Sequence, residues 1–134
     1  MTREEVTRWL GRYVEAWKTY DRDQVEALFA EDISYRYHPY DEAIEGREAV
    51  VDSWLEAGEF AGGATGRDEP GTYEAYYRCV AADGDMAVAI GQSSYRDSPD
   101  GPIARVYDNC FVMRFDGEGR CREFTEWFMQ RPSP

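Results

Sequence analysis

The feature that most restricts the fold of this chain is a series of four long strand-like segments that fills its second half. Each segment is rich in β-branched and aromatic residues, and the four span about 72–82, 86–96, 103–115 and 120–130. Asp-Gly pairs, which favour tight turns, begin between the segments at Asp83, Asp100 and Asp116. Short connections between long strands predict an antiparallel meander, and a sheet of such strands is strongly twisted and curved.

The first part of the chain has helical periodicity instead. Thr2 and Glu5 form a capping-box pattern that marks the start of a helix. Apolar residues then recur at intervals of three and four residues, at Val6, Trp9, Leu10, Tyr13 and Trp17. We expect this helix to extend to about Thr19 and to pack its apolar face against the sheet.

A second, shorter helix is expected to follow, capped by Asp21 or Asp23 and ending near Ala30. Its apolar face would consist of Val25, Leu28 and Phe29. The two helices would then form a helical hairpin.

The segment 33–38 is rich in tyrosine and stops at Pro39, which is typical of a short edge strand that enters a loop. Gly46 then precedes a third helix, whose apolar residues are Val50, Val51, Trp54 and Leu55. The glycine-rich connection 58–71 follows this helix, and we interpret it as a mobile flap.

Helices followed by a long meander indicate a single α+β domain, 1–134, in which the helices cover one face of the sheet. The other face also needs a cover, because both faces of the last two strands carry apolar residues. On the segment 103–115, for example, Phe111 and Met113 alternate with Cys110 and Val112. A second copy of the chain would bury the outer face, so we predict a homodimer.

Charge and composition exclude several kinds of partner. The chain has 27 acidic and 15 basic residues, so its average surface repels both a phosphate backbone and anionic lipid. No apolar run approaches the ~20 residues that span a bilayer, and the first residues lack the apolar segment of a secretory signal. We therefore predict a cytoplasmic protein that binds neither nucleic acid nor membrane. Cys79, Cys110 and Cys121 lack metal-type spacing and are expected to be buried free thiols.

A set of short motifs occurs in a defined order along the chain. They are Gly11–Trp17, Asp23–Phe29, Asp32-Ile33, Pro39, Gly46–Val50, Tyr107–Phe115, Asp116–Gly119 and Arg122–Trp127. Their order and spacing resemble those of SnoaL-like proteins of the NTF2-like superfamily, over nearly the whole chain. The resemblance implies a cone-shaped α+β domain: three N-terminal helices pack on a strongly curved antiparallel sheet and enclose a pocket for a small hydrophobic organic molecule.

This superfamily includes ketosteroid isomerase, polyketide cyclases, dehydratases, epoxide hydrolases and noncatalytic binding or transport proteins, so the resemblance leaves several functions open. In the ketosteroid isomerase pattern, a tyrosine of the first helix and a protonated strand aspartate form an oxyanion hole opposite an aspartate base. Tyr13 matches the tyrosine, but Phe111 stands at the strand aspartate and His38 at the base. Steroid isomerisation by that route is therefore not expected. Tyr13 is either a hydrogen-bond donor to a ligand oxygen or a core residue.

His38 and Glu126 are the candidate catalytic acids or bases. His38 is the only histidine, and imidazole titrates nearest neutral pH, which suits a general base; the alternative is a half-buried structural residue. The resemblance implies that Glu126 faces the helices among aromatic residues, as does Arg122. Desolvation would raise the pKa of Glu126 for acid–base work, whereas an ion pair with Arg122 or Arg105 would keep it ionised and structural.

The remaining candidates would bind the ligand. The resemblance places Asn109 inside the cone, where it could orient a ligand carbonyl or hydroxyl, or hold Glu126 or Tyr13 in place. The expected pocket walls are Trp17, Tyr35, Tyr37, Trp54, Phe111, Phe124 and Phe128. The sequence contains no phosphate loop, metal-ligand cluster, nucleophile elbow or dinucleotide motif, which implies a pocket without a metal or cofactor.

Two functions remain open at this level. The first is a cofactor-independent isomerase, cyclase, dehydratase or hydrolase, in which His38 and Glu126 act as acid or base on a small hydrophobic oxygenated substrate. The second is a noncatalytic ligand-binding or protein-interaction module whose polar groups hold one another. A cavity of a few hundred Å³ that His38 and Glu126 both face would favour the enzyme.

Overall fold

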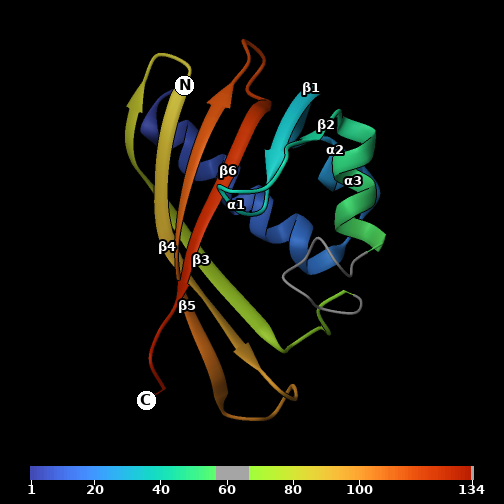
Figure 1. The fold of residues 1–134 in the computed structure, drawn as a ribbon, viewed down its shortest axis with the longest axis vertical. Coiled ribbons are helices and arrows are strands. Elements are labelled where there is room, and N and C mark those ends of the chain that lie inside the picture. Colours follow the sequence, from blue (N-terminus) through green and yellow to red (C-terminus); the bar gives the residue numbers. More distant parts are fainter. Residues whose placement is uncertain (57–66, 134) are drawn as a thin grey trace.

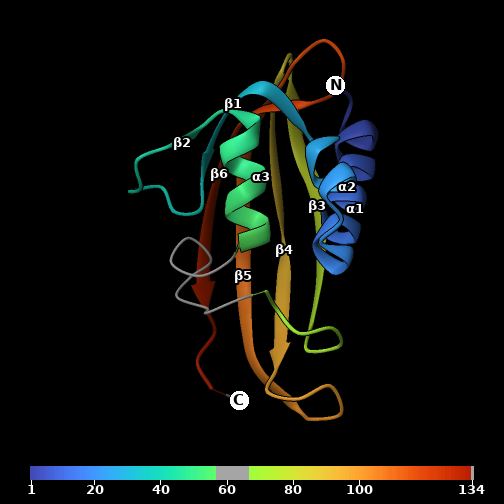
Figure 2. The same cartoon turned by 90° about the vertical axis from the view of Figure 1, so that its right-hand side faces the viewer.

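The structure of the protein is a computed structural model that describes residues 1–56 and 67–133. Within these residues, three helices lie on one face of a six-stranded sheet (Figure 1). The elements are α1 (Arg3–Thr19), α2 (Arg22–Glu26), β1 (Phe29–Arg36), β2 (Ile44–Glu45), α3 (Arg47–Glu56), β3 (Tyr73–Asp83), β4 (Met86–Arg96), β5 (Ile103–Phe115) and β6 (Cys121–Gln130). Figure 2 shows all three helices on the same face, as the sequence predicts. None of these described helices is long and apolar enough to cross a membrane.

Helix α1 begins at the predicted capping box. The Thr2 hydroxyl oxygen accepts a hydrogen bond from the Glu5 backbone N–H at 3.1 Å, and the Glu5 carboxylate accepts one from the Thr2 backbone N–H at 3.0 Å. The helix ends at Thr19 because Tyr20 adopts a left-handed φ of 50°. Its buried residues are Val6, Trp9, Leu10, Tyr13 and Ala16. The predicted start, end and apolar face of this helix are confirmed.

Helix α2 is shorter than the sequence predicts. It ends at Glu26, and the side chain of its N-cap residue, Asp21, makes no capping hydrogen bond. The chain leaves the helix because the next residues join the sheet: the Leu28 carbonyl accepts a hydrogen bond from the Cys121 N–H at 2.9 Å, and Phe29 pairs with Cys121. The prediction that Phe29 lies on a helix is therefore wrong, since pairing with a distant strand outweighed the local apolar spacing.

Strand β1 is longer than expected and lies inside the sheet. The strand order is β2-β1-β6-β5-β4-β3, so the two-residue β2 occupies the edge where the sequence predicted β1. Strand β1 pairs antiparallel with β2 but parallel with β6, where Tyr35 lies opposite Phe124. The sheet is therefore mixed rather than wholly antiparallel. Parallel pairing is possible here because α3 and four strands separate β1 from β6 along the chain.

Strands β3 to β6 match the four predicted segments closely, and each pairs antiparallel with its neighbour. The register shifts between Cys79 and Ala81, between Tyr95 and Arg96, and between Arg114 and Phe115. Bulges of this kind bend a strand and increase its twist. They contribute to the curvature of the sheet around α1 that is visible in Figure 1.

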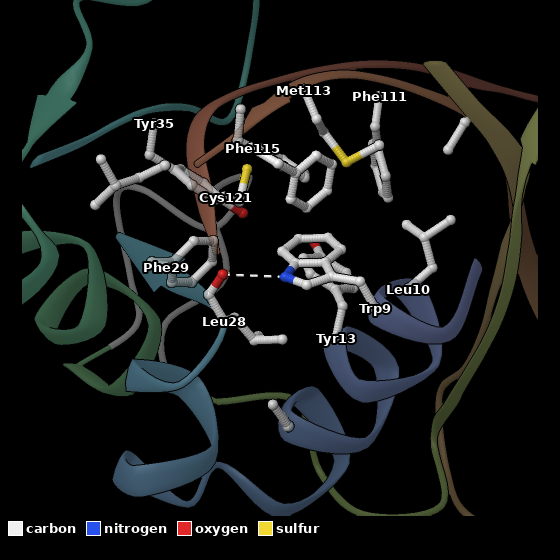
Figure 3. Close-up of a cluster of buried hydrophobic side chains, with 14 of the residues drawn as sticks. Trp9, Leu10, Tyr13, Leu28, Phe29, Tyr35, Phe111, Met113, Phe115 and Cys121 are labelled. Carbon is white, nitrogen blue, oxygen red and sulfur yellow. Dashed lines mark hydrogen bonds between the residues drawn. The ribbon is translucent and has the colours of Figure 1, made fainter. Parts of the chain in front are cut away.

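An aromatic core fills the space between α1 and the sheet (Figure 3). Trp9 is central to it: the indole Nε1 donates a hydrogen bond to the Leu28 carbonyl at 3.0 Å, and the ring centroid lies 5.4 Å from that of Phe115. This contact fixes α1 to the point where β1 begins. Phe111 and Phe124 are 1% and 0% exposed and belong to the same core.

The face of the sheet away from the helices keeps apolar side chains exposed. Ile90, Cys110 and Trp127 pair across β4, β5 and β6, and they form a row on this outer face. Ile90 is 38% exposed and Trp127 is 44% exposed. The alternation predicted for the last strands is therefore present in the structure.

Candidate functional site

A cavity of about 240 Å³ lies between the helices and the inner face of the sheet. Its walls are mainly aromatic and come from α1, β1, α3 and all four strands of the meander. The polar and ionisable groups among the residues that line it include His38, Ser53, Asp68, Ser93, Asn109 and Glu126. A small, aromatic cavity with a few convergent polar groups is the usual form of a site for a small organic molecule.

Nine of the eleven candidate residues line this cavity. They are Tyr13, Trp17, Tyr35, Tyr37, His38, Trp54, Asn109, Glu126 and Phe128. Phe111 and Phe124 do not line it, contrary to expectation, because both are buried in the core below. The Phe124 ring stacks against Tyr35 at 4.6 Å and against Tyr13 at 5.8 Å, between centroids. These two phenylalanines therefore support the cavity walls and cannot contact a ligand.

Glu126 projects from β6 toward the cavity, and it is held by residues from the next two strands of the sheet, β5 and β4. The Asn109 amide Nδ2 on β5 donates a hydrogen bond to Glu126 Oε2 at 2.8 Å. The amide oxygen of Asn109 in turn accepts a hydrogen bond from the Ser93 hydroxyl on β4 at 3.1 Å. Ser93 and Asn109 are buried, so this relay is shielded from bulk water. One carboxylate oxygen of Glu126 is thus fixed, and the other makes no hydrogen bond to the described residues.

The environment of Glu126 favours its protonated form. Burial raises the pKa of this carboxyl from 4.5 to about 7, and the hydrogen bond from Asn109 offsets part of the rise. No cation among the described residues forms a salt bridge with it. The cavity therefore contains a carboxyl group that exchanges its proton near neutral pH.

The two arginines considered as partners of Glu126 bind other carboxylates. Arg105 lines the cavity but pairs with Asp97 at 3.7 Å. Arg122 is exposed and pairs with Asp85 at 3.4 Å. The expectation that Arg122 faces the helices is wrong because the register shift at the start of β6 displaces it from the inner face.

Five tyrosines surround Glu126 closely enough for its charge to affect them. They are Tyr13, Tyr35, Tyr37, Tyr77 and Tyr95. Burial raises the pKa of each hydroxyl, and the negative charge of Glu126 raises it further. All five phenols therefore stay neutral at physiological pH. A neutral phenol can donate a hydrogen bond to a ligand oxygen.

His38 lies in the loop after β1, where a neighbouring carboxylate orients its ring. Asp41 Oδ2 contacts His38 Nδ1 at 2.9 Å and accepts a hydrogen bond from the His38 backbone N–H at 3.1 Å. An ionised carboxylate only accepts hydrogen bonds, so Nδ1 carries the proton in this contact. Nε2 is then the basic atom of the neutral ring. The rings of Tyr40 and Phe128 each lie 5.1 Å from the imidazole, between centroids.

Sequence analysis missed several groups at this site. Asp41 follows His38 by three residues, and the intervening Pro39 favours a turn that brings the two together, so that spacing was the available signal. Asp68 accepts hydrogen bonds from the Trp17 indole at 3.0 Å and from the Tyr20 hydroxyl at 3.4 Å, which connects distant segments that no local pattern links. The interpretation of 58–71 as a flap falls mainly on 57–66, outside the described residues.

The structure offers no candidate metal centre within the described ranges, since no group of three His, Cys, Asp or Glu residues converges there. Cys79 and Cys121 are buried free thiols as predicted, whereas Cys110 is only half-buried on the outer face of the sheet.

Several solved structures share this fold. An NTF-2 like protein of unknown function from Burkholderia xenovorans LB400 has a TM-score of 0.67 and 18% identity, over 98% of this chain and 88% of that chain. A candidate ketosteroid isomerase from Kribbella flavida DSM 17836 has a TM-score of 0.66 and 18% identity, over 98% and 82% of the two chains. An LEH-like epoxide hydrolase from M. tuberculosis has a TM-score of 0.60 and 18% identity, over 94% and 84%.

A search of curated proteins found no significant relative of this chain. The profile of a family described as SnoaL-like domain, in contrast, matches residues 10–124. This match includes α1 from Leu10 onward, the other helices and strands around the cavity, and the part of β6 that ends at Phe124. The chain therefore shares the fold of NTF2-like proteins and belongs to the SnoaL-like domain family.

Proposed function

We propose that this protein is a cofactor-independent enzyme in which Glu126 transfers a proton to and from a small hydrophobic oxygenated molecule bound in the cavity. The observation that carries this proposal is the environment of Glu126: a half-buried carboxyl that faces the cavity without a salt-bridge partner among the described residues, with a pKa of about 7. A catalytic acid or base works best when its pKa lies near the pH of the reaction. Structural carboxylates are instead kept ionised by a cation or by several N–H donors.

The geometry gives the two oxygens of Glu126 different roles. Oε2 is held by Asn109, whereas Oε1 has no hydrogen bond to the described residues and is available to the ligand. The protonated carboxyl can donate a proton, and the ionised carboxylate, which is poorly solvated, is a stronger base than an exposed one. The surrounding neutral phenols can stabilise negative charge that develops on a ligand oxygen.

His38 would serve as a second proton carrier on the same cavity, with Asp41 holding its ring. This pairing of an imidazole with a carboxylate fixes the tautomer and the orientation of the ring. With Glu126 as base, and His38 as acid once its Nε2 atom is protonated, a proton could be removed from one atom of the ligand and another returned elsewhere. Isomerisation, cyclisation, dehydration and hydrolysis all use steps of this kind.

The structural neighbours support the general substrate class. Two of them are named as a candidate ketosteroid isomerase and an epoxide hydrolase, and both names refer to small oxygenated organic molecules. The aromatic walls and the volume of about 240 Å³ suit a ligand of that chemistry.

A noncatalytic binding module is the second candidate, and the internal hydrogen bonds favour it. Ser93, Asn109 and Glu126 form a chain of hydrogen bonds, and the Tyr37 and Ser53 hydroxyls lie 2.9 Å apart. If these groups only hold one another, the cavity would bind a ligand without changing it.

Replacement of Glu126 tests the catalytic proposal. Small ketones, lactones and epoxides would be screened for turnover, and Glu126→Gln compared with the parent on any substrate found. Loss of the proton-transfer group should lower kcat by roughly 100-fold or more. Glu123→Gln is the matched control, because Glu123 lies on the same strand but is exposed and pairs with Arg114 at 3.0 Å.

The two candidate functions predict different outcomes. Unchanged turnover in Glu126→Gln would remove this residue from the mechanism. Ligand binding without turnover in the parent would favour the binding module. For the enzyme, kcat should rise with pH around about 7 if Glu126 acts as the base, and that dependence should disappear in Glu126→Gln.

We also propose that the outer sheet face forms a homodimer. The exposed row of Ile90, Cys110 and Trp127 is an apolar surface that a second copy of the chain would bury. Such an interface would lie on the opposite side of the sheet from the cavity.

A further inference from the structure

Arg105 is a cation on the cavity wall that the proposed proton transfer does not use. It lines the cavity, and its side chain is 43% exposed. A guanidinium stays charged throughout the physiological pH range, whereas Glu126 and His38 are proposed to exchange protons. A permanent positive charge beside a ligand site selects ligands by their charge.

Strand alternation places Arg105 on the same face of the sheet as the polar groups of the site. Arg105, Tyr107 and Asn109 are alternate residues of β5, and the register between β5 and β4 is regular over this stretch. Their side chains therefore point to one face. Four residues of a strand span ~13 Å, so Arg105 lies about that far from Asn109 along β5. Asn109 holds Glu126, so the cation and the proposed base mark two separated points on the cavity wall.

Arg105 lies toward the open end of the sheet. It is the third residue of β5, and the ends of β4 and β5 that join through the loop 97–102 extend beyond the helices (Figure 2). Asn109, farther along the same strand, is only 7% exposed. The cavity wall therefore runs from a half-exposed cation toward a buried polar centre.

Aromatic packing holds the Arg105 side chain in position. Its guanidinium carbon lies 5.2 Å from the centroid of the Tyr95 ring, which is a cation–π contact. The Tyr95 ring packs in turn against Trp17 at 6.1 Å and against Tyr107 at 5.6 Å, between centroids. A guanidinium held by an aromatic ring has already lost part of its conformational freedom, so less is lost when an anion binds it.

The carboxylate that contacts Arg105 is a weak partner. Asp97 Oδ1 lies 3.7 Å from Arg105 Nη1, beyond hydrogen-bond distance, and the Asp97 side chain is 86% exposed. Surface pairs of this kind contribute little to stability. Arg131, in contrast, binds both oxygens of Asp108, at 2.8 and 2.9 Å. A ligand carboxylate could make the same two-point contact with Arg105 and displace Asp97.

The other carboxylates of the cavity leave room for an anion beside Arg105. Asp68 Oδ2 accepts hydrogen bonds from the Trp17 indole at 3.0 Å and from the Tyr20 hydroxyl at 3.4 Å, and these donors offset part of its charge. Glu126 lies at the far end of the ~13 Å span, which exceeds the Debye length of ~8 Å at physiological ionic strength. Repulsion between Glu126 and an anion at Arg105 is therefore weak.

From this arrangement, and on the basis of the ligand cavity proposed above, we infer that Arg105 binds a carboxylate at one end of an elongated hydrophobic ligand. Two parallel N–H···O bonds would join the guanidinium to the carboxylate. The apolar body would lie against the aromatic walls and extend toward Asn109 and Glu126. One guanidinium matches a single negative charge, and the acidic surface of the protein disfavours a dianionic phosphate. The substrate class thus narrows to oxygenated acids whose carboxylate lies on the order of 10 Å from the reacting atoms.

Binding of a matched pair of ligands tests this inference without requiring turnover. The ω-(para-fluorophenyl) derivatives of pentanoate and pentanamide have nearly the same size and shape, but only the first is charged. Fluorine NMR titrations of the full chain would measure the Kd for both. The parent should bind the carboxylate roughly five- to tenfold more tightly than the amide. Arg105→Gln should lose this preference, with little change in the Kd for the amide.

Arg120→Gln is the matched control. Arg120 also contacts an exposed carboxylate at 3.7 Å, that of Glu118, and its side chain is 46% exposed, but it does not line the cavity. Both arginine variants change the net charge equally, so only a direct contact with the ligand distinguishes them. Asp97→Asn removes the competing carboxylate and should keep or increase the preference. If Arg105 served only its ion pair, Arg105→Gln and Asp97→Asn would instead lower the Tm alike and leave the preference intact.

Salt provides an independent measurement. The preference of the parent for the carboxylate should weaken as the salt concentration rises, because ions screen a half-exposed charge pair, whereas the Kd for the amide should not show this dependence. A preference that does not respond to salt would contradict an ionic contact with Arg105.

The inference is overturned by a parent that binds the two ligands equally or binds neither, or by an Arg105→Gln variant that still prefers the carboxylate. Failure of the proposed function looks different. If Arg105→Gln loses the preference while Glu126→Gln retains full turnover, the carboxylate site stands and the general base falls. If Glu126→Gln abolishes turnover while Arg105→Gln keeps the preference, the base stands and the carboxylate site falls.

Discussion

The Asn109 amide donates a hydrogen bond to one oxygen of the Glu126 carboxylate at 2.8 Å. This is the interaction at the site that lowers the pKa of Glu126, against the larger opposite effect of burial. Because Asn109 comes from β5 and Glu126 from β6, the pairing of two adjacent strands sets the acidity of the proposed catalytic group.

Removal of this hydrogen bond should raise the pKa of Glu126. In Asn109→Leu the side chain keeps a similar size, so the site stays dry while the ionised carboxylate loses its donor. The pH at which Glu126 titrates should therefore move upward from about 7, which NMR of the carboxyl carbon can measure. Ser93→Ala, which removes only the bond to Asn109, should shift it less. A downward shift in Asn109→Leu would contradict this account.

Glu126 should make the protein less stable as pH rises. Its pKa is about 7 when folded and 4.5 for an ordinary glutamate, so the folded state binds more protons between these values. The free energy of unfolding should therefore fall as pH rises from ~5 to ~8, by up to roughly 3 kcal/mol from this group. Glu126→Gln removes this contribution, so urea unfolding at both pH values should show the variant gaining stability over the parent only at the higher pH. Glu123→Gln should show no such change.

Gly91 should be the least replaceable glycine on the inner strands. A Cβ atom at this position would collide with the carbonyl oxygen of Tyr76 and come within 2.6 Å of the Tyr77 ring. Gly91→Ala should therefore lower the free energy of unfolding by about 2–3 kcal/mol, as measured in urea. Gly11→Ala is the matched control: it lies in α1 with nothing within 4 Å, and it should stabilise the protein by up to ~1 kcal/mol. Equal effects of the two changes would show that β3 and β4 relax easily.

Charges on the outer sheet face should weaken the proposed dimer. Trp127→Glu and Val106→Glu place a carboxylate on the surface that a second copy would cover, where desolvation is costly. Sedimentation velocity should show a shift toward monomer in both variants. Tyr40→Glu replaces an aromatic residue in the loop after β1 that is more exposed than Trp127, and it should leave the distribution unchanged. A parent that sediments as a monomer would refute the dimer.

The sequence alone determined the elements whose signals are local. The start of α1 depends on Thr2 and Glu5, which lie within one turn of each other, and the ends of β3 to β6 depend on Asp-Gly turns. Alternation along β5 likewise placed Asn109 and Phe111 on the same face of the sheet. Patterns of this kind can be recognised because helices and strands repeat over a few residues, whatever the rest of the chain does.

Only the tertiary structure decided the features that depend on distant partners. Phe29 belongs to β1 because Cys121 pairs with it, although its local spacing favours a helix. Arg122 leaves the inner face at a register shift that no local pattern reveals, and Glu126 therefore remains without a salt bridge in the described part of the chain. Strand pairing, strand register and the hydrogen bonds of buried polar groups all depend on contacts between distant segments. Those contacts exist only in the folded chain.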